Sequence, residues 1–289
     1  MPEGRIELCN VRGRAALIVA ERVIDVEQRS AGRFSRDPMD ALARWDELCA
    51  FGEGLTARED DVRLEPSALG PCVPRPRQVF AIGLNYRDHA RETGMAEPKQ
   101  PMVFTKFASC LTGARGSIEL TSDAVDWEVE LVVVIGQQAR RIPAARALDH
   151  VAGYCVGQDV SDRRLQFADT PPQFSLAKSA AGFGPIGPSV VARKCLGSER
   201  FALRCDVDGV RMQDGTTDDM VFPVPALLEY LTRFVTLYPG DLIFTGTPSG
   251  VGSGRKPPQF LRPGSVVRSE ISGLGVLENR CVAAGSAPQ

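Results

Sequence analysis

One segment constrains the fold more than any other, the run WEVELVVVIG at residues 127–136. Its β-branched side chains predict a strand, because they pack well on a pleated surface. Side chains along a strand alternate between its two faces, so Glu128 and Glu130 point the same way as Val132. The opposite face is wholly apolar, and beyond the glutamates both faces are therefore expected to be buried.

The two glutamates would lie close together at the end of this apolar strand. Carboxylates in that position repel each other, and a cation would relieve the repulsion. The chain has only two histidines, and its eight cysteines include no C-x-x-C pair, so a metal site would be built mainly from oxygen atoms. Oxygen ligands favour Mg²⁺ or Mn²⁺ over Zn²⁺. The alternative is a solvated strand end whose glutamates face water.

A third carboxylate, Asp159, follows another apolar strand in GYCVGQDVSDRRLQ. Asp162 is the competing ligand candidate in the same segment. The alternative for both residues is an ordinary turn after the strand, where aspartate and serine bond to nearby backbone groups.

Three further features could take part in chemistry. If RDHARET forms a helix, His89 and Glu92 lie on one face, and the carboxylate can orient the imidazole as a general base. Lys178, before a Gly/Ala/Pro stretch expected to be flexible, could bind a carboxylate or stabilise an enolate. The glycines of residues 245–254 would let the backbone approach a ligand closely. The alternatives are a surface helix turn, an exposed loop lysine and a surface loop without function.

The chain after residue 78 reads mostly as short strands separated by glycine and proline. Helical spacing there is confined to RDHARETG, ALDHV and PALLEYLTRFV. This pattern predicts a β-rich α+β domain, rolled or barrel-like, rather than a doubly wound parallel sheet. Neither G-x-x-x-x-G-K-[ST] nor a G-x-G-x-x-G between strand and helix occurs, which argues against nucleotide-binding enzymes of those types.

The start of the chain is expected to form a small separate unit, residues 1–70. RAALIVAERVIDV suggests a strand or hairpin, and PMDALARWDELCAF has helical spacing. The proline-rich joint PCVPRPRQ at 71–78 interrupts any regular element, because proline fixes φ and lacks an N–H donor. We therefore predict a domain boundary near residue 70, followed by a larger domain at 71–289.

Charge and hydropathy exclude several classes of protein. A formal net charge of -2 argues against binding to a nucleic-acid backbone, which requires clustered lysine and arginine. No run approaches the roughly 18 apolar residues that span a bilayer. The N-terminus lacks the basic start and apolar stretch of a secretory signal, so a cytoplasmic protein is expected.

Five segments together closely resemble the fumarylacetoacetate hydrolase family: GLNYRDHARE, DWEVELVVVIG, GYCVGQDVSDRRLQ, SLAKS…GFGPIGP and PGDLIFTGTPSGVG. They occur in the family's order across residues 78–282. The resemblance implies a mixed β-roll catalytic domain, usually dimeric, preceded by a variable N-terminal region. One departure is that Lys178-Ser179 is followed by Ala180-Ala181-Gly182, where many members carry an aromatic and an acidic residue. This segment borders the substrate in relatives, so the substrate of this chain is expected to differ in size and shape from the substrates of those relatives.

The resemblance also implies roles for particular residues. The implied Mg²⁺ or Mn²⁺ ligands are Glu128, Glu130 and Asp159; the implied water-activating dyad is His89 and Glu92; the residues implied to contact the substrate are Arg163, Gln166, Lys178 and Thr247. The expected reaction is hydrolysis of an acylpyruvate-like 2,4-diketo acid, with Lys178 helping to stabilise a pyruvate enolate. The alternatives are oxaloacetate decarboxylation, isomerisation of unsaturated dicarboxylates and sugar-acid dehydration, or a non-catalytic protein that kept the fold.

Overall fold

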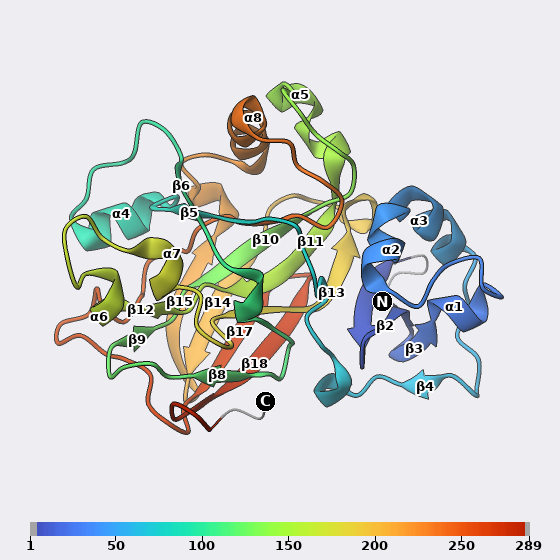
Figure 1. Ribbon diagram of the computed structural model, residues 1–289, viewed down its shortest axis with the longest axis horizontal. Coiled ribbons are helices and arrows are strands. Elements are labelled where there is room, and N and C mark those ends of the chain that lie inside the picture. The colour runs from blue at the N-terminus through green and yellow to red at the C-terminus, as the bar shows by residue number, and fades with distance from the viewer. Residues whose placement is uncertain (1–4, 287–289) are drawn as a thin grey trace.

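The computed structural model describes residues 5–286, and most of its regular structure is β-sheet (Figure 1). The largest sheet has eleven strands. In spatial order they are β4 (Val62–Arg63), β3 (Arg22–Asp25), β2 (Arg14–Val19), β1 (Glu7–Val11), β13 (Gly184–Ala192), β11 (Val151–Gln158), β10 (Val129–Ile135), β16 (Leu242–Phe244), β5 (Val79–Gly83) and β6 (Met102–Thr105), with β7 (Leu111–Thr112) paired to β13. The predicted β-rich α+β class is confirmed.

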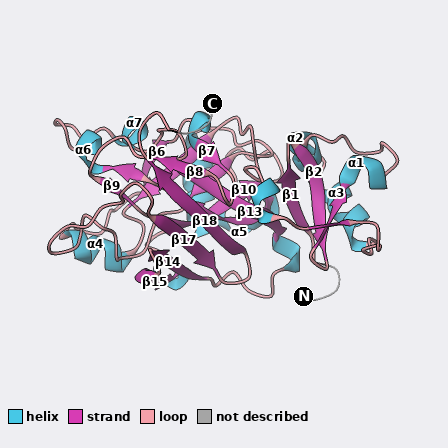
Figure 2. Ribbon diagram, turned by 90° about the horizontal axis from the view of Figure 1, so that it is seen from below, coloured by secondary structure: helices cyan, strands magenta, loops and turns pink. Residues whose placement is uncertain are grey.

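A second sheet of five strands packs against one face of the large sheet. Its order is β15 (Val210–Thr216), β14 (Ala202–Val207), β17 (Val266–Ile271), β18 (Gly275–Val282) and β8 (Ser117–Glu119), while β9 (Val125–Asp126) pairs separately with β12 (Ser161–Asp162). Figure 2 shows β14, β17 and β18 lying side by side. Leu203, Val267 and Leu277 belong to the buried cluster that fills the space between the sheets.

Strand β10 lies between two hydrophobic cores, as its alternation predicts. Leu131 and Val133 join the core that faces the five-stranded sheet. Val132 and Val134 point to the other face, into the core that contains Leu42 of the N-terminal region. All seven residues of β10 are buried, so the expected burial of both faces is confirmed.

The helices are short and lie around the sheets. They are α1 (Val26–Arg29), α2 (Pro38–Ala43), α3 (Trp45–Glu53), α4 (Arg87–Thr93), α5 (Ala144–Ala147), α6 (Arg163–Gln166), α7 (Phe174–Ala177) and α8 (Val224–Phe234). Helices α4, α6 and α7 gather at one end of the molecule, while α1, α2 and α3 lie at the other (Figure 1). Within residues 5–286, no helix is long and apolar enough to cross a bilayer.

The large sheet runs across the boundary predicted near residue 70. Strand β1 pairs antiparallel with β13, with Leu8 opposite Val190, so the N-terminal strands extend the sheet that carries β10. The expectation of a flexible stretch after Lys178 is wrong, because β13 begins at Gly184 and is almost wholly buried. Its glycines and prolines have little intrinsic β preference, and pairing with β1 and β11 decides its conformation.

Candidate metal and active site

Three carboxylates meet where β10 begins and β11 ends. The strands are antiparallel neighbours, and the backbone N–H of Asp159 donates to the carbonyl of Glu128 at 2.9 Å. One oxygen atom from each of Glu128, Glu130 and Asp159 lies within 4.8 Å of the others. The three residues are 6%, 1% and 0% exposed, respectively. The alternative of glutamates facing water is therefore wrong.

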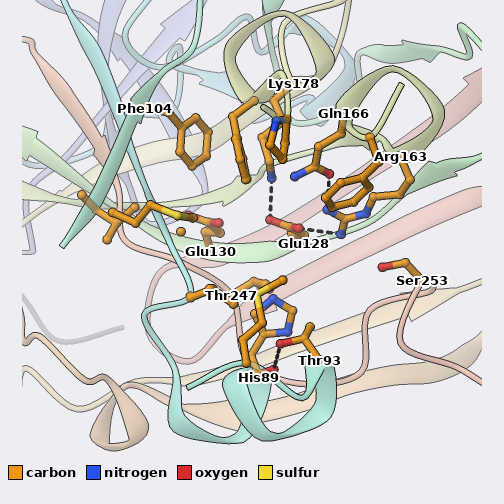
Figure 3. A pocket seen from close by; sticks show the side chains of 18 residues that line it. His89, Thr93, Phe104, Glu128, Glu130, Arg163, Gln166, Lys178, Thr247 and Ser253 are labelled. Carbon is orange, nitrogen blue, oxygen red and sulfur yellow. Dashed lines mark hydrogen bonds and ion pairs between the residues drawn. The ribbon is translucent and has the colours of Figure 1, made fainter. Parts of the chain in front are cut away.

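Two buried lysines lie against these carboxylates. Lys178 Nζ donates to Glu128 Oε2 at 2.8 Å and to Asp159 Oδ2 at 2.7 Å, as the upper part of Figure 3 shows for Glu128. Lys106, which is 3% exposed, donates from Nζ to Asp159 Oδ1 at 2.6 Å and to the carbonyl of Phe183 at 3.2 Å. Lys178 is likewise 3% exposed, so an exposed loop lysine is excluded there.

Arg163, the first residue of α6, connects the carboxylates to a neighbouring loop. Its guanidinium donates to Glu128 Oε1 at 2.6 Å, to Asp126 Oδ2 at 2.9 Å and to Gln166 Oε1 at 2.9 Å. Asp126 is fully buried and also accepts from the backbone N–H groups of Gly252 at 2.7 Å and Ser253 at 3.0 Å. Asp126 therefore fixes both the arginine and the glycine-rich loop.

Asp162, the competing ligand candidate, has a different role. Its carboxylate caps α6 by accepting from the backbone N–H of Leu165 at 3.0 Å, and it also accepts from the hydroxyls of Thr121 and Ser122 at 2.6 and 2.9 Å. These bonds turn Asp162 toward the helix start, and it is not one of the three clustered carboxylates.

The charges in the cluster shift one another's pKa values. Burial raises the pKa of Glu130 well above its ordinary value, and Asp159 and Glu128 raise it further. Burial also acts to raise the pKa of Glu128, but the cations Lys178 and Arg163 outweigh it and lower that pKa to about 2. Burial disfavours the Lys178 ammonium, yet Asp159 and Glu128 more than compensate and raise its pKa.

The donor set fits a divalent metal ion. Four buried carboxylates gather with three buried cations; they are Asp126, Glu128, Glu130 and Asp159, with Lys106, Arg163 and Lys178. The cluster thus has one negative charge in excess when every group is ionised, and burial, together with the neighbouring carboxylates, raises the pKa of Glu130. Carboxylate oxygens are the ligands that Mg²⁺ and Mn²⁺ prefer. A divalent ion together with one bound substrate carboxylate would bring the charge to zero.

Helix α4 supplies the predicted dyad, and the predicted helix is confirmed. His89 Nδ1 lies 3.3 Å from Glu92 Oε2, and the Glu92 carboxylate also accepts from the backbone N–H of Gly250 at 3.0 and 3.1 Å. Leu84, between β5 and α4, has a φ of 52°, which is rare for a branched side chain. Such strain is often retained at functional sites, and this turn leads the chain into the helix that carries His89.

A cavity of about 320 Å³ lies over the cluster, within the range of small-molecule sites. Seven of the nine residues implicated by sequence line it: His89, Glu128, Glu130, Arg163, Gln166, Lys178 and Thr247. Figure 3 shows His89 on the opposite side of Glu128 from Lys178. The hydroxyl of Thr247 is already engaged, because it donates to the Val129 carbonyl and accepts from Gln213 Nε2, both at 2.8 Å.

Two buried residues of the site escaped the sequence analysis, Lys106 and Asp126. A sequence feature marks each of them. Lys106 is a charged residue within the mostly apolar run PMVFTKF, and Asp126 directly precedes the segment with the two glutamates. Among the described residues that line the cavity, none comes from the departure Ala180-Ala181-Gly182. The next residue, Phe183, contacts the site indirectly, because its carbonyl accepts from Lys106.

Known proteins resemble this chain in sequence and in fold. Residues 78–282 match the fumarylacetoacetate (FAA) hydrolase C-terminal domain family. Oxaloacetate tautomerase FAHD2B, mitochondrial, of Bos taurus is 45% identical over 223 residues, which cover 76% of this chain and 71% of that protein. A solved Mycobacterium smegmatis protein, provisionally named HpcE, is 46% identical with a TM-score of 0.91, covering 96% of this chain and 99% of that one.

Fumarylpyruvate hydrolase from Pseudomonas aeruginosa, solved with Mn²⁺ and pyruvate, is 30% identical with a TM-score of 0.65, covering 79% of this chain and 94% of that one. The family match covers well over half of the chain, and its limits include the carboxylate cluster and the dyad. The chain therefore belongs to the fumarylacetoacetate hydrolase family of metal-dependent enzymes.

Proposed function

We propose that this protein hydrolyses the carbon–carbon bond of an acylpyruvate-type 2,4-diketo acid with Mg²⁺ or Mn²⁺ as cofactor. The observation that carries the proposal is the His89–Glu92 pair, which lies beside the cavity that contains the carboxylate cluster. Isomerisation requires only proton transfer within the substrate, whereas hydrolysis also requires activation of a water molecule. An oriented imidazole is suited to that step.

Glu92 is held so that it can orient the imidazole. The N–H of Gly250 donates to both of its carboxylate oxygens, which fixes the carboxylate beside His89 Nδ1. With Nδ1–H donated to Glu92, Nε2 is the basic nitrogen. We infer that Nε2 takes a proton from a water molecule in the cavity.

The oxygen of that water then attacks the carbonyl carbon farther from the substrate carboxylate. The bond between this carbon and C3 breaks, and its electron pair remains on the pyruvate fragment as an enolate. The proton held on His89 returns to C3, so the products are a carboxylic acid and pyruvate. Lys178, already held by two carboxylates, supplies positive charge beside the developing enolate.

Glu128, Glu130 and Asp159 would hold the metal ion. When bound, the ion supplies Lewis-acid polarisation to the keto and carboxylate oxygens of the substrate. The Arg163 guanidinium donates to Gln166 Oε1 at 2.9 Å, and both side chains line the cavity. They would bind and orient the substrate carboxylate.

The test is release of pyruvate from 2,4-dioxopentanoate in the presence of Mg²⁺ or Mn²⁺, followed through NADH oxidation by lactate dehydrogenase. His89→Asn should lower kcat by about 10²- to 10⁴-fold, the usual contribution of a general base. His150, the other histidine, does not line the cavity and provides the matched control His150→Asn. The proposal fails if the native protein releases no pyruvate, or if both variants behave alike.

A second candidate, oxaloacetate tautomerisation, is favoured by the 45% identity to the bovine protein of that name. The same dyad could move a proton between C3 and the 2-keto oxygen without any attack by water. Loss of the enol absorbance of oxaloacetate, without pyruvate formation from the diketo acid, would favour this candidate over hydrolysis.

A further inference from the structure

The lining of the cavity combines two kinds of side chain. Charged groups, including Glu128, Glu130, Arg163 and Lys178, share it with large apolar side chains. These include Met95 after α4, Met102 and Phe104 of β6, and Phe167 and Phe174 of the α6–α7 region. The rings of Phe104 and Phe174 pack against each other, with centroids 5.5 Å apart.

Apolar side chains continue to the mouth of the cavity. Met95 is 51% exposed and Phe167 is 53% exposed, although large hydrophobic residues are usually covered in a folded protein. Two such side chains at one cavity mouth indicate a surface that gains by covering apolar groups of a ligand. A substrate longer than pyruvate would therefore extend along this wall.

Positive charges are few in the cavity, and one of them lies beside the apolar side chains, because Lys178 Nζ is 5.3 Å from the centre of the Phe104 ring. Among the described lining residues, the only lysine or arginine side chains are Arg163 and Lys178. Both are already paired, Arg163 with Asp126 and Glu128, and Lys178 with Glu128 and Asp159. A second carboxylate at the far end of a substrate would lose water beside Phe104 and Phe174, and the cation nearest to Phe104, Lys178, is already shared by two carboxylates.

We propose that this site selects 2-keto acids with a single carboxylate and an uncharged, apolar far end, and discriminates against dicarboxylates. The inference rests on the proposed function, because it places the keto-acid end of the substrate at the carboxylate cluster. It separates this chain from relatives whose named substrates, such as fumarylpyruvate and oxaloacetate, carry a second carboxylate.

The test is binding, measured by isothermal titration calorimetry with Mg²⁺ present, of 2-oxo acids that have no cleavable diketone. The series 2-oxobutanoate, 2-oxopentanoate and 2-oxohexanoate should bind about fourfold more tightly with each added CH₂. The matched dicarboxylate 2-oxopentanedioate should bind at least tenfold more weakly than 2-oxopentanoate. Equal or tighter binding of the dicarboxylate would overturn the proposal, as would affinity that does not change with chain length.

A charge variant tests the same wall directly. Met95→Arg places a cation at the exposed mouth, where the fold tolerates it, and should bring the affinity for 2-oxopentanedioate at least level with that for 2-oxopentanoate. Val210→Arg is the control, because Val210 is 58% exposed and does not line this cavity. An unchanged preference in Met95→Arg, or the same change in both variants, would contradict the proposal.

These binding results are separable from the proposed hydrolysis. If the series behaves as expected while 2,4-dioxopentanoate is not cleaved, the hydrolytic function fails and the specificity stands. If pyruvate is released but dicarboxylates bind better, the specificity fails and the hydrolysis stands. No binding of any of the 2-oxo acids would overturn the specificity proposal.

Discussion

Replacing Asp126 by asparagine should destabilise the protein and weaken substrate binding, although Asp126 is not placed against the substrate. Each of its carboxylate oxygens accepts two hydrogen bonds in a fully buried position. Oδ1 accepts from the backbone N–H groups of Trp127 and Gly252 at 2.8 and 2.7 Å. Oδ2 accepts from Arg163 Nε at 2.9 Å and from the Ser253 N–H at 3.0 Å.

An asparagine side chain keeps one oxygen and replaces the other with an NH₂ group, which cannot accept a hydrogen bond. Whichever way the amide turns, two donors lose their acceptor. Hydrogen bonds to charged groups contribute about 1.5–3 kcal/mol each. Arg163 keeps Glu128 and Gln166, so we take the lower end of that range, and expect Asp126→Asn to lose about 3 kcal/mol of unfolding free energy. At this chain length that corresponds to a fall of about 5 °C in Tm.

The assay combines thermal unfolding with steady-state kinetics. Asp126 acts through Arg163 and the glycine-rich loop, so the variant should raise KM about tenfold, which corresponds to about 1.4 kcal/mol of lost binding free energy. It should lower kcat by a smaller factor. The control is Asp123→Asn, which makes the same chemical change at an exposed residue paired with Arg164. The reasoning is refuted if Asp126→Asn melts within about 1 °C of the native protein, or if the control falls equally far.

Three other changes test separate parts of the structure. Lys178→Met leaves two buried carboxylates without their shared ammonium group; the metal-free variant should lose about 3–5 kcal/mol of stability, and Mg²⁺ should raise its Tm more than that of the native protein. An equal response to Mg²⁺ would contradict this. Glu92→Gln keeps the shape of the side chain but removes the charge beside the dyad imidazole, so kcat should fall at least tenfold with little change in Tm, and an unchanged kcat would exclude the proposed role. Gly157→Ala brings a Cβ within 2.4 Å of a valine methyl group and should cost about 1–3 kcal/mol, whereas Gly197→Ala meets nothing within 4 Å and should be neutral, both measured by thermal unfolding.

The sequence was sufficient to predict the strand that organises the site. β10 carries apolar side chains on both faces, so its burial and the common direction of Glu128 and Glu130 followed from alternation alone. Helix α4 could also be predicted from the sequence, and the i, i+3 spacing of His89 and Glu92 then places both side chains on one face of it. In both cases the interacting residues are near neighbours in the chain.

Other parts of the site depend on contacts between distant residues. Lys106 lies 53 residues from Asp159, and no local pattern shows that its ammonium group reaches that carboxylate. Strand β13 has weak local β preference and is held by neighbours on both sides, which explains why its glycines and prolines suggested a flexible stretch. The apolar strand before it made Asp159 a candidate beside Asp162, and the resemblance to a family supplied its role and that of Arg163, but their contacts depend on the folded chain.

The side chains that line the cavity also differ in how firmly the fold holds them. The carboxylates lie at the ends of β10 and β11, which pair over seven positions in the middle of the large sheet, so the core fixes them. The large apolar side chains come from the edge strand β6, the segment after α4 and the region of the four-residue helices α6 and α7. Substitutions of these apolar side chains should therefore cost less stability while they change what fits beyond the keto acid. We therefore expect substitutions around Phe104 and Phe174 to change which substrate is accepted while leaving the carboxylate cluster in place.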